Sequence, residues 1–258
     1  MMSLTHRVLP LIVLLIACPW AITSEMPAYQ EDIDFRVREV NSDVIAWRRD
    51  IHEHPELSNR ETRTSALVAE HLLSLGLEVR TGIAHTGVVG VLRGGKPGKI
   101  VALRADMDAL PVTEQVDVPF ASKVRTTYNN QEVGVMHACG HDVHTAVLMG
   151  TASVLAGMRD EIPGTVVFIF QPAEEGPPAG EDGGAKMMIA EGVLDAPAPD
   201  AIFGLHAWPI RRGIIGYRSG GTMAGADGLS ITITGSQTHG AVPWAGVDPI
   251  VVASQVIM

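Results

Sequence analysis

A cysteine and a histidine, Cys139 and His141, lie two residues apart in the segment MHACGHD. In an extended segment alternate side chains point the same way, so both can reach one ion. Two adjacent carboxylates, Glu174 and Glu175, and a further histidine, His206, follow along the chain. Thiolate, imidazole and carboxylate together are the ligands expected for a first-row divalent ion such as zinc or manganese. The sequence therefore predicts a metal site formed by Cys139, His141, Glu175 and His206.

The paired carboxylates also suit hydrolysis. In an extended loop, adjacent side chains point to opposite sides, so one carboxylate can bind a metal while the other faces a substrate. A carboxylate beside a metal-bound water can take its proton and return it to a leaving nitrogen. A solvated acidic loop is the alternative, but the apolar segment 168–170 directly before the pair indicates the end of a core strand.

Several neighbouring polar residues are expected to support this site. Asp106 and Asp108 alternate at the end of a predicted strand, and we favour support of a ligand over direct metal binding. Asp142 begins a predicted helix and is interpreted as its N-cap, while His144 is interpreted as structural. His239, judged on spacing alone, is an exposed histidine in a turn.

The pattern of elements predicts an α/β fold in which a layered sheet is flanked by helices. Most candidate ligands follow strand ends, where such folds place their sites. A glycine-rich segment, 94–98, predicts a turn that joins the predicted strands 87–92 and 100–105 into a hairpin. Residues 111–138 are expected to be irregular. The predicted helices cover residues 33–54, 61–75 and 143–157, and the predicted strands cover 87–92, 100–105, 165–170 and 201–206.

A different pattern begins near residue 225. Segment 229–234 alternates between apolar and polar residues, as a half-exposed strand does, and 247–258 is a mostly apolar predicted helix without a polar end. We therefore predict a catalytic domain over 30–224 and the start of a smaller lid or dimerisation domain over 225–258. The chain is expected to end inside that second domain, as a truncated form of a longer enzyme.

The first 24 residues predict a secretory signal peptide. An apolar run behind Arg7 is too short and too interrupted by proline for a membrane span. Cleavage within 21–24 would give a protein exported to the periplasm or the medium, and lipidation of Cys18 is the alternative. Either event leaves Cys139 without a partner cysteine, and a lone cysteine in an oxidising compartment is expected to be metal-bound or reactive.

The overall charge excludes one class of partner. The chain has 258 residues with 19 basic and 29 acidic side chains, a net charge of -10. Nucleic-acid binding needs a basic surface, so no nucleic-acid partner is expected.

Several motifs together resemble the metal-dependent amidohydrolases, a family that includes hippurate hydrolases, N-acyl-amino-acid amidohydrolases and plant auxin-conjugate hydrolases. The resemblance runs from about residue 35 to the last residue, and the order of the motifs matches throughout. The motifs are Ile51–Ser58, Leu103–Pro111, Met136–Asp142, Phe170–Gly176, Thr238–Pro243 and Val247–Ile250.

The resemblance implies a site with two divalent ions, zinc or manganese, or else cobalt. The ligands that it implies are Cys139, His141, Glu175 and His206. It further implies that Glu174 is the general base and that Asp108 supports the site. His239 resembles a lid-domain histidine that is donated across a dimer to stabilise the tetrahedral oxyanion. The family has a further metal-binding histidine after its lid domain, and this sequence stops before that point.

The function predicted on this basis is hydrolysis of the amide bond between an acyl group and an amino acid. The substrate would be a small-molecule N-acyl amino acid, and the full-length form would be a homodimer. One alternative is a cysteine hydrolase that uses Cys139 as its nucleophile, but this leaves Glu175 and His206 without a role. The other is a truncated metal-binding or dimerisation protein without activity.

Overall fold

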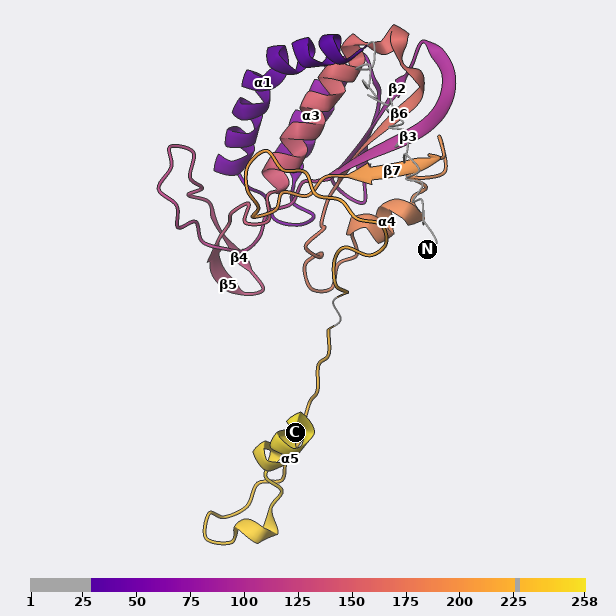
Figure 1. Cartoon of the computed structure of the whole chain (residues 1–258). Coiled ribbons are helices and arrows are strands. Elements are labelled where there is room, and N and C mark those ends of the chain that lie inside the picture. The colour runs from indigo at the N-terminus through magenta and orange to yellow at the C-terminus, as the bar shows by residue number, and fades with distance from the viewer. Residues whose placement is uncertain (1–28, 226–227) are drawn as a thin grey trace, which may run out of the picture. The chain divides into compact units, whose positions relative to one another are not determined.

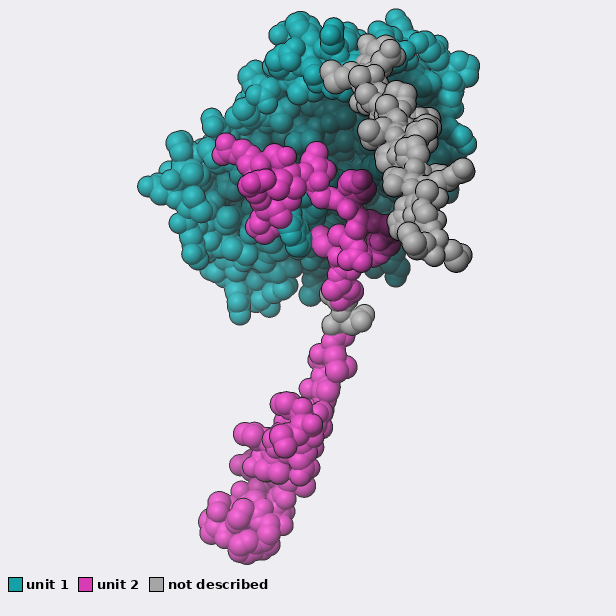
Figure 2. Space-filling view, viewed as in Figure 1, with its two compact units in different colours: residues 1–208 teal, residues 209–258 magenta. Residues whose placement is uncertain are grey.

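The computed structural model describes residues 29–225 and 228–258. These residues fall into two compact units, which are divided between Trp208 and Pro209 (Figure 2). The predicted signal peptide and Cys18 lie outside the described residues. None of the helices in the described part of the chain is long and apolar enough to cross a membrane. Each unit is described by itself.

The first unit is built on a five-stranded mixed sheet with the strand order β1-β2-β6-β3-β7 (Figure 1). Strand β6 is parallel to β3 and antiparallel to β2, and β3 is parallel to β7. The residues of β6 from Val166 to Phe170 are all buried, as expected for a strand covered on both faces. The strands are β1 (Glu78–Ile83), β2 (Gly87–Arg93), β3 (Lys96–Asp106), β6 (Pro163–Gln171) and β7 (Ala201–Gly204).

Helices cover both faces of this sheet, so the predicted α/β class is confirmed. Phe168 and Phe170 point into a core shared with α2 (Thr62–Ser74) and α3 (His141–Gly157). The alternate residues Val167 and Ile169 point into a second core, on the side of α4 (Gly184–Ala190). Helix α1 (Gln30–Glu53) lies along α3 (Figure 1), and a short 3-10 helix, Arg159–Glu161, follows α3.

The three predicted helices of this unit are confirmed within a few residues. In each segment the spacing of the apolar residues predicted the buried face of the helix, and a proline or glycine predicted the end of the first two helices. Helix α1 stops before Pro55, and α2 stops before Gly76, whose φ of 72° suits glycine.

The predicted hairpin at 94–98 is wrong, because β6 lies between β2 and β3. The backbone of this turn bonds to the chain that enters β6: Gly94 N donates to Gly164 O at 2.8 Å, and Gly95 N donates to Arg159 O at 2.8 Å. A Cβ atom on Gly94 would lie 2.2 Å from Ile162 O. The glycines therefore permit a close approach of backbones, which is a second use of glycine beside the tight turn.

Four elements were not predicted: β1, α4 and the hairpin of β4 (Arg125–Tyr128) and β5 (Gln131–Gly134). The hairpin lies in the stretch that was expected to be irregular. Its turn residues Asn129 and Asn130 have φ values of 50° and 62°, the conformation of a type I′ turn. This asparagine pair was the available signal.

The second unit contains a 3-10 helix, Pro243–Ala245, and helix α5 (Pro249–Ile257). Asp248 caps α5, since its Oδ1 accepts a hydrogen bond of 2.8 Å from Ile250 N, and the predicted helix is confirmed. The strand predicted at 229–234 is not formed; the described part of this unit pairs only Ser236 with Val247. A strand needs a hydrogen-bonding neighbour, which alternation alone cannot supply. The domain boundary at residue 225 stays a prediction.

Candidate metal centre

The candidate ligands of the first unit lie at one edge of the sheet. Strands β3, β6 and β7 are parallel, so their carboxyl ends meet at the same edge. Asp108 follows β3, the 174–175 pair follows β6 and His206 follows β7. Cys139 and His141 reach the same place from the start of α3.

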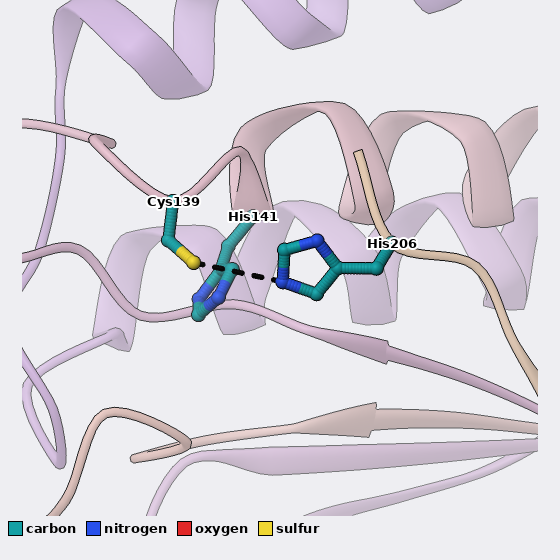
Figure 3. A group of neighbouring side chains, drawn as sticks. All are labelled: Cys139, His141 and His206. Atoms are coloured by element: carbon teal, nitrogen blue, oxygen red, sulfur yellow. Dashed lines mark hydrogen bonds between the residues drawn. The ribbon is translucent and has the colours of Figure 1, made fainter. Parts of the chain in front are cut away.

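Three of the four predicted ligands form one cluster. The side chains of Cys139, His141 and His206 point toward one another (Figure 3), and their ligand atoms lie within 4.8 Å of each other. The Sγ atom of Cys139 is 3.6 Å from Nε2 of His206. The fourth predicted ligand, Glu175, places its Oε1 atom 3.8 Å from Nε2 of His141. The structure therefore brings the predicted set together around His141.

His141 is oriented for metal binding. Its Nδ1–H donates to the backbone oxygen of Asp108 at 2.8 Å, so the neutral ring has its free lone pair on Nε2. Nε2 is buried and has no hydrogen-bond partner among the described residues. A buried polar atom without a partner is costly, and a bound cation would satisfy it.

The charges around His141 also favour a cation. Burial lowers the pKa of His141, but the hydrogen bond to Asp108 and the charges of Asp106, Asp108 and Glu175 outweigh it and raise that pKa above its ordinary value. The site therefore stabilises positive charge. A divalent ion supplies such charge, and the donor set fits one of the first transition row.

Glu174 and Glu175 do not point to opposite sides, so that expectation is wrong. Oε2 of Glu174 lies 3.7 Å from Nε2 of His141, about as close as the nearest oxygen of Glu175. The residues form a turn rather than an extended loop, flanked by Ala173 at φ 48° and Gly176 at φ 100°. The turn presents both carboxylates to the same nitrogen.

Asp108 connects the two halves of the cluster. Its buried carboxylate accepts hydrogen bonds from Ser58 Oγ at 2.8 Å and from the backbone N of Glu175 at 3.0 Å. Its other oxygen lies 3.2 Å from Nδ1 of His141. These contacts orient one predicted ligand and the backbone of another, in agreement with the supporting role expected of Asp108. Ser58 ends the motif Ile51–Ser58, but its spacing gave no indication of this contact.

Asp106 and His144 form a second buried pair. Nδ1 of His144 lies 2.6 Å from Oδ1 of Asp106, and Nε2 accepts a bond of 2.6 Å from the backbone N of Ala207. Both ring nitrogens are thus occupied, which suits a structural role. Burial raises the pKa of Asp106, but the bond to His144 and the charges of His141 and Arg104 lower it to about 2. Asp106 therefore stays ionised.

The expected N-cap role of Asp142 is wrong. Helix α3 begins after Gly140, which has a φ of 92° and makes no side-chain cap. Asp142 instead lies in a buried network, where it forms an ion pair with Arg48 Nε at 2.9 Å and accepts a hydrogen bond of 2.8 Å from His52 Nδ1. These partners come from α1, far along the chain, so local sequence could not reveal them.

Cys139 needs a cation to become a thiolate. Burial and the nearby carboxylates Glu175 and Glu174 raise its pKa to about 12. A cysteine nucleophile requires the opposite shift, toward a lower pKa. The environment of this sulfur therefore suits a metal ligand better than a nucleophile.

His239 belongs to the second unit and is described within it. Its Nδ1 accepts a hydrogen bond of 3.0 Å from the backbone N of Ala241, and the side chain is exposed in a turn before the 3-10 helix. This agrees with the exposed turn expected from its spacing.

Comparisons with known proteins bear on the family of the chain. Residues 102–253 match the model of peptidase family M20/M25/M40. The chain is 48% identical over 224 residues to thermostable carboxypeptidase 1 of Saccharolobus solfataricus, covering 85% of this chain and 53% of that protein. It is 45% identical over 229 residues to the N-acyl-L-amino acid amidohydrolase of Geobacillus stearothermophilus, covering 88% of this chain and 58% of that protein. The chain thus spans about half the length of the curated relatives it matches.

A solved structure gives the same result for the fold. The YXEP protein of Bacillus subtilis, described as a dinuclear metal binding peptidase from the M20 family, is 44% identical with a TM-score of 0.58. The match covers 67% of this chain and 44% of that one.

Proposed function

This chain belongs to peptidase family M20/M25/M40, and from that premise we propose that it forms the metal centre of an enzyme that hydrolyses the amide bond of N-acyl amino acids or similar conjugates. The observation that carries the proposal is the buried Nε2 atom of His141. It has no protein partner among the described residues, and a thiol, a second imidazole and two carboxylates surround it.

Four side chains of the first unit would hold the metal: Cys139, His141, Glu175 and His206. Two divalent ions, zinc or manganese, or else cobalt, would polarise the substrate carbonyl and lower the pKa of a bound water. The thiolate of Cys139 is the soft ligand of the set, and Asp108 holds His141 in the tautomer that offers Nε2.

Glu174 would move the proton. Its side chain is 39% exposed and lies 3.7 Å from Nε2 of His141, so it reaches both the ligand cluster and the solvent side where a substrate enters. A carboxylate in this place takes a proton from the attacking water and gives it to the amine nitrogen as the C–N bond breaks. This step gives a carboxylic acid and a free amino acid.

The activities in the names of two relatives concern the same type of bond. A carboxypeptidase and an N-acyl-amino-acid amidohydrolase both cleave an amide whose nitrogen belongs to an amino acid. We propose a small-molecule N-acyl amino acid as the substrate of this chain.

Further features of the protein are proposals that rest on sequence motifs. The match of Thr238–Pro243 supports a role for His239 in stabilising the oxyanion, across a homodimer in the full-length form. The apolar run behind Arg7 supports a signal peptide over 1–24 and export from the cytoplasm.

Two measurements on the purified chain test the proposal. Titration of the metal-depleted chain with Zn²⁺ or Co²⁺ should show binding that His141→Ala removes. Release of amino acid from N-benzoylglycine and from N-acetyl amino acids should depend on the added metal. A chain that binds neither ion would contradict the proposal.

A further inference from the structure

The four residues that precede α2 make hydrogen bonds that fix the turn with Glu174 and Glu175 and the loop that follows it. Ser58 bonds to Asp108, which in turn accepts the backbone N–H of Glu175. Asn59 donates to Asp182 O at 3.1 Å and to Glu181 Oε2 at 3.0 Å, farther along the same loop. The last of these residues, Glu61, makes the contact nearest to the turn.

Glu61 contacts the turn directly. Its Oε1 atom accepts a hydrogen bond of 2.8 Å from the backbone N of Ala173, the residue immediately before Glu174. Its Oε2 atom accepts one of 2.6 Å from Thr86 Oγ1. The side chain thus connects the start of α2, the β1–β2 turn and the loop after β6.

The burial of Glu61 is costly. The residue is 0% exposed, and no basic nitrogen of the described residues lies within 4.0 Å of its carboxylate. Burial is the largest effect on this group and raises its pKa, against the hydrogen bonds from Thr86 and Ala173. Burial of a carboxyl group without a cationic partner lowers the stability of the fold. The position of Glu61 in the core therefore indicates a role at the turn.

Ala173 shows what that role is. The residue is buried and has a φ of 48°, a left-handed conformation that is unfavourable for residues other than glycine. Its oxygen is confined as well, since a Cβ atom on Gly184 would lie 2.8 Å from it. Strained backbone of this kind persists only where surrounding contacts fix it. The hydrogen bond to Glu61 fixes the N–H of Ala173, as Asp108 fixes that of Glu175.

We propose that Glu61 is a positioning residue that holds Ala173 in its left-handed conformation, so that Glu174 and Glu175 both face His141. Its consequence for metal binding rests on the proposed function. The contact itself does not, because both of its partners are protein groups.

The test compares substitutions of Glu61 with a control of similar destabilisation. Glu61→Leu keeps the size of the side chain and removes the acceptor, whereas Glu61→Gln keeps a neutral acceptor. Val91→Ala serves as the control, because it removes buried volume from the core on the other face of the sheet. The readouts on the 258-residue chain are the amide hydrogen-exchange rate of Ala173 without metal, the affinity for Co²⁺ and the unfolding temperature.

The variants are expected to differ in the amide exchange rate of Ala173. Exchange should be fastest in Glu61→Leu, about tenfold or more above wild type, with Glu61→Gln between them because a neutral acceptor is weaker. Co²⁺ affinity should fall about ten- to a hundredfold in Glu61→Leu, as for other residues that orient metal ligands, and less in Glu61→Gln. Val91→Ala should lower the unfolding temperature and leave exchange at Ala173 and Co²⁺ affinity as in wild type.

Other outcomes would overturn the inference. Unchanged exchange in Glu61→Leu, or equal changes in Val91→Ala, would mean that Glu61 serves stability alone. If Glu61→Leu does not fold, the difference between Glu61→Gln and wild type decides in the same way. A wild-type chain that fails to bind Co²⁺ contradicts the proposed function, whereas wild-type binding that Glu61→Leu leaves intact contradicts this inference alone.

Discussion

The carboxylate of Glu174 combines access to solvent with contact to the buried cluster around His141. Because it is not among the predicted ligands, its replacement by the isosteric amide should leave metal binding intact. We expect Glu174→Gln to lower kcat about 10²–10⁴-fold, the usual contribution of a general base. Amino-acid release and Co²⁺ titration measure the two effects.

The matched control is Glu175→Gln, which should weaken Co²⁺ binding instead. Full turnover by Glu174→Gln would remove the assignment of the base. Loss of metal affinity in that variant would place Glu174 among the ligands.

At the scale of single residues, the sequence was most informative about residue type. Cysteine, histidine and carboxylate in separate motifs predicted which side chains would gather. It did not show the hydrogen bonds that orient them. Asp142 was misassigned because its partners Arg48 and His52 lie in another helix, and Glu61 was missed because its contact to Ala173 spans 112 residues.

Two glycines of α3 differ in what a methyl group would meet, which tests the packing of α1 on α3. A Cβ atom on Gly150 would lie 2.4 Å from Cγ2 of Val44, a stiff β-branched side chain. On Gly157 it would lie 2.4 Å from Nη1 of Arg36, the end of a flexible side chain. We expect Gly150→Ala to lower the free energy of unfolding by about 1–3 kcal/mol through overpacking.

Gly157→Ala should lower it by much less or raise it slightly, since alanine is favoured over glycine in a helix by about 0.5–1 kcal/mol. Urea unfolding of both variants gives the comparison. The double variant Val44→Ala, Gly150→Ala should recover part of the loss. Equal effects of the two alanines would mean that α1 is not packed closely on α3.

A half-buried histidine between the helices is expected to make the stability of this layer depend on pH. Nε2 of His71 in α2 lies 3.1 Å from Met149 O and 3.0 Å from Ser153 Oγ of α3, and its ring packs against Trp47 of α1. Burial lowers the pKa of His71, and this outweighs the raising effects of Met149 O and the charge of Asp43. The folded chain therefore takes up this proton at a lower pH than the unfolded chain does.

The unfolded state binds more protons once the pH falls below about 6.5, the ordinary histidine pKa, so His71 reduces stability on acidification from that point down to its folded pKa. His71→Gln cannot gain this charge. We expect the difference in unfolding free energy, wild type minus variant, to decrease between pH 7 and pH 5. A difference that is constant with pH in urea unfolding would contradict this account.

At the scale of elements, periodicity located helices and strands but not their neighbours. The hairpin at 94–98 was wrong because no local signal shows that β6 inserts between β2 and β3. The β4–β5 hairpin was missed although Asn129 and Asn130 offered a turn signal. Segment 229–234 alternates correctly, yet a strand also needs a partner, and the described residues of its unit provide none there.

At the scale of the whole molecule, the fold class and the family were predictable because they rest on several ordered motifs, each of which tolerates local errors. The two units differ in how much of their chemistry they contain. All four predicted ligands lie in the first unit, whereas His239 lies in the second. The predicted metal ligands and the proposed oxyanion histidine can therefore be tested separately.

Because the predicted ligands lie in the first unit, a bound metal is expected to stabilise the protein through that unit. An ion that binds only the folded state stabilises it by RT ln(1 + [L]/Kd), about 2.7 kcal/mol at a concentration of 100 Kd. We expect Co²⁺ or Zn²⁺ to raise the unfolding temperature of the chain and a chelator to reverse the shift. His141→Ala should abolish the shift, because it removes the buried acceptor around which the ligands gather. His239→Ala should leave the shift unchanged while it lowers turnover. A shift that survives in His141→Ala would place the bound ion elsewhere, and one that disappears in His239→Ala would make the second unit part of the metal site.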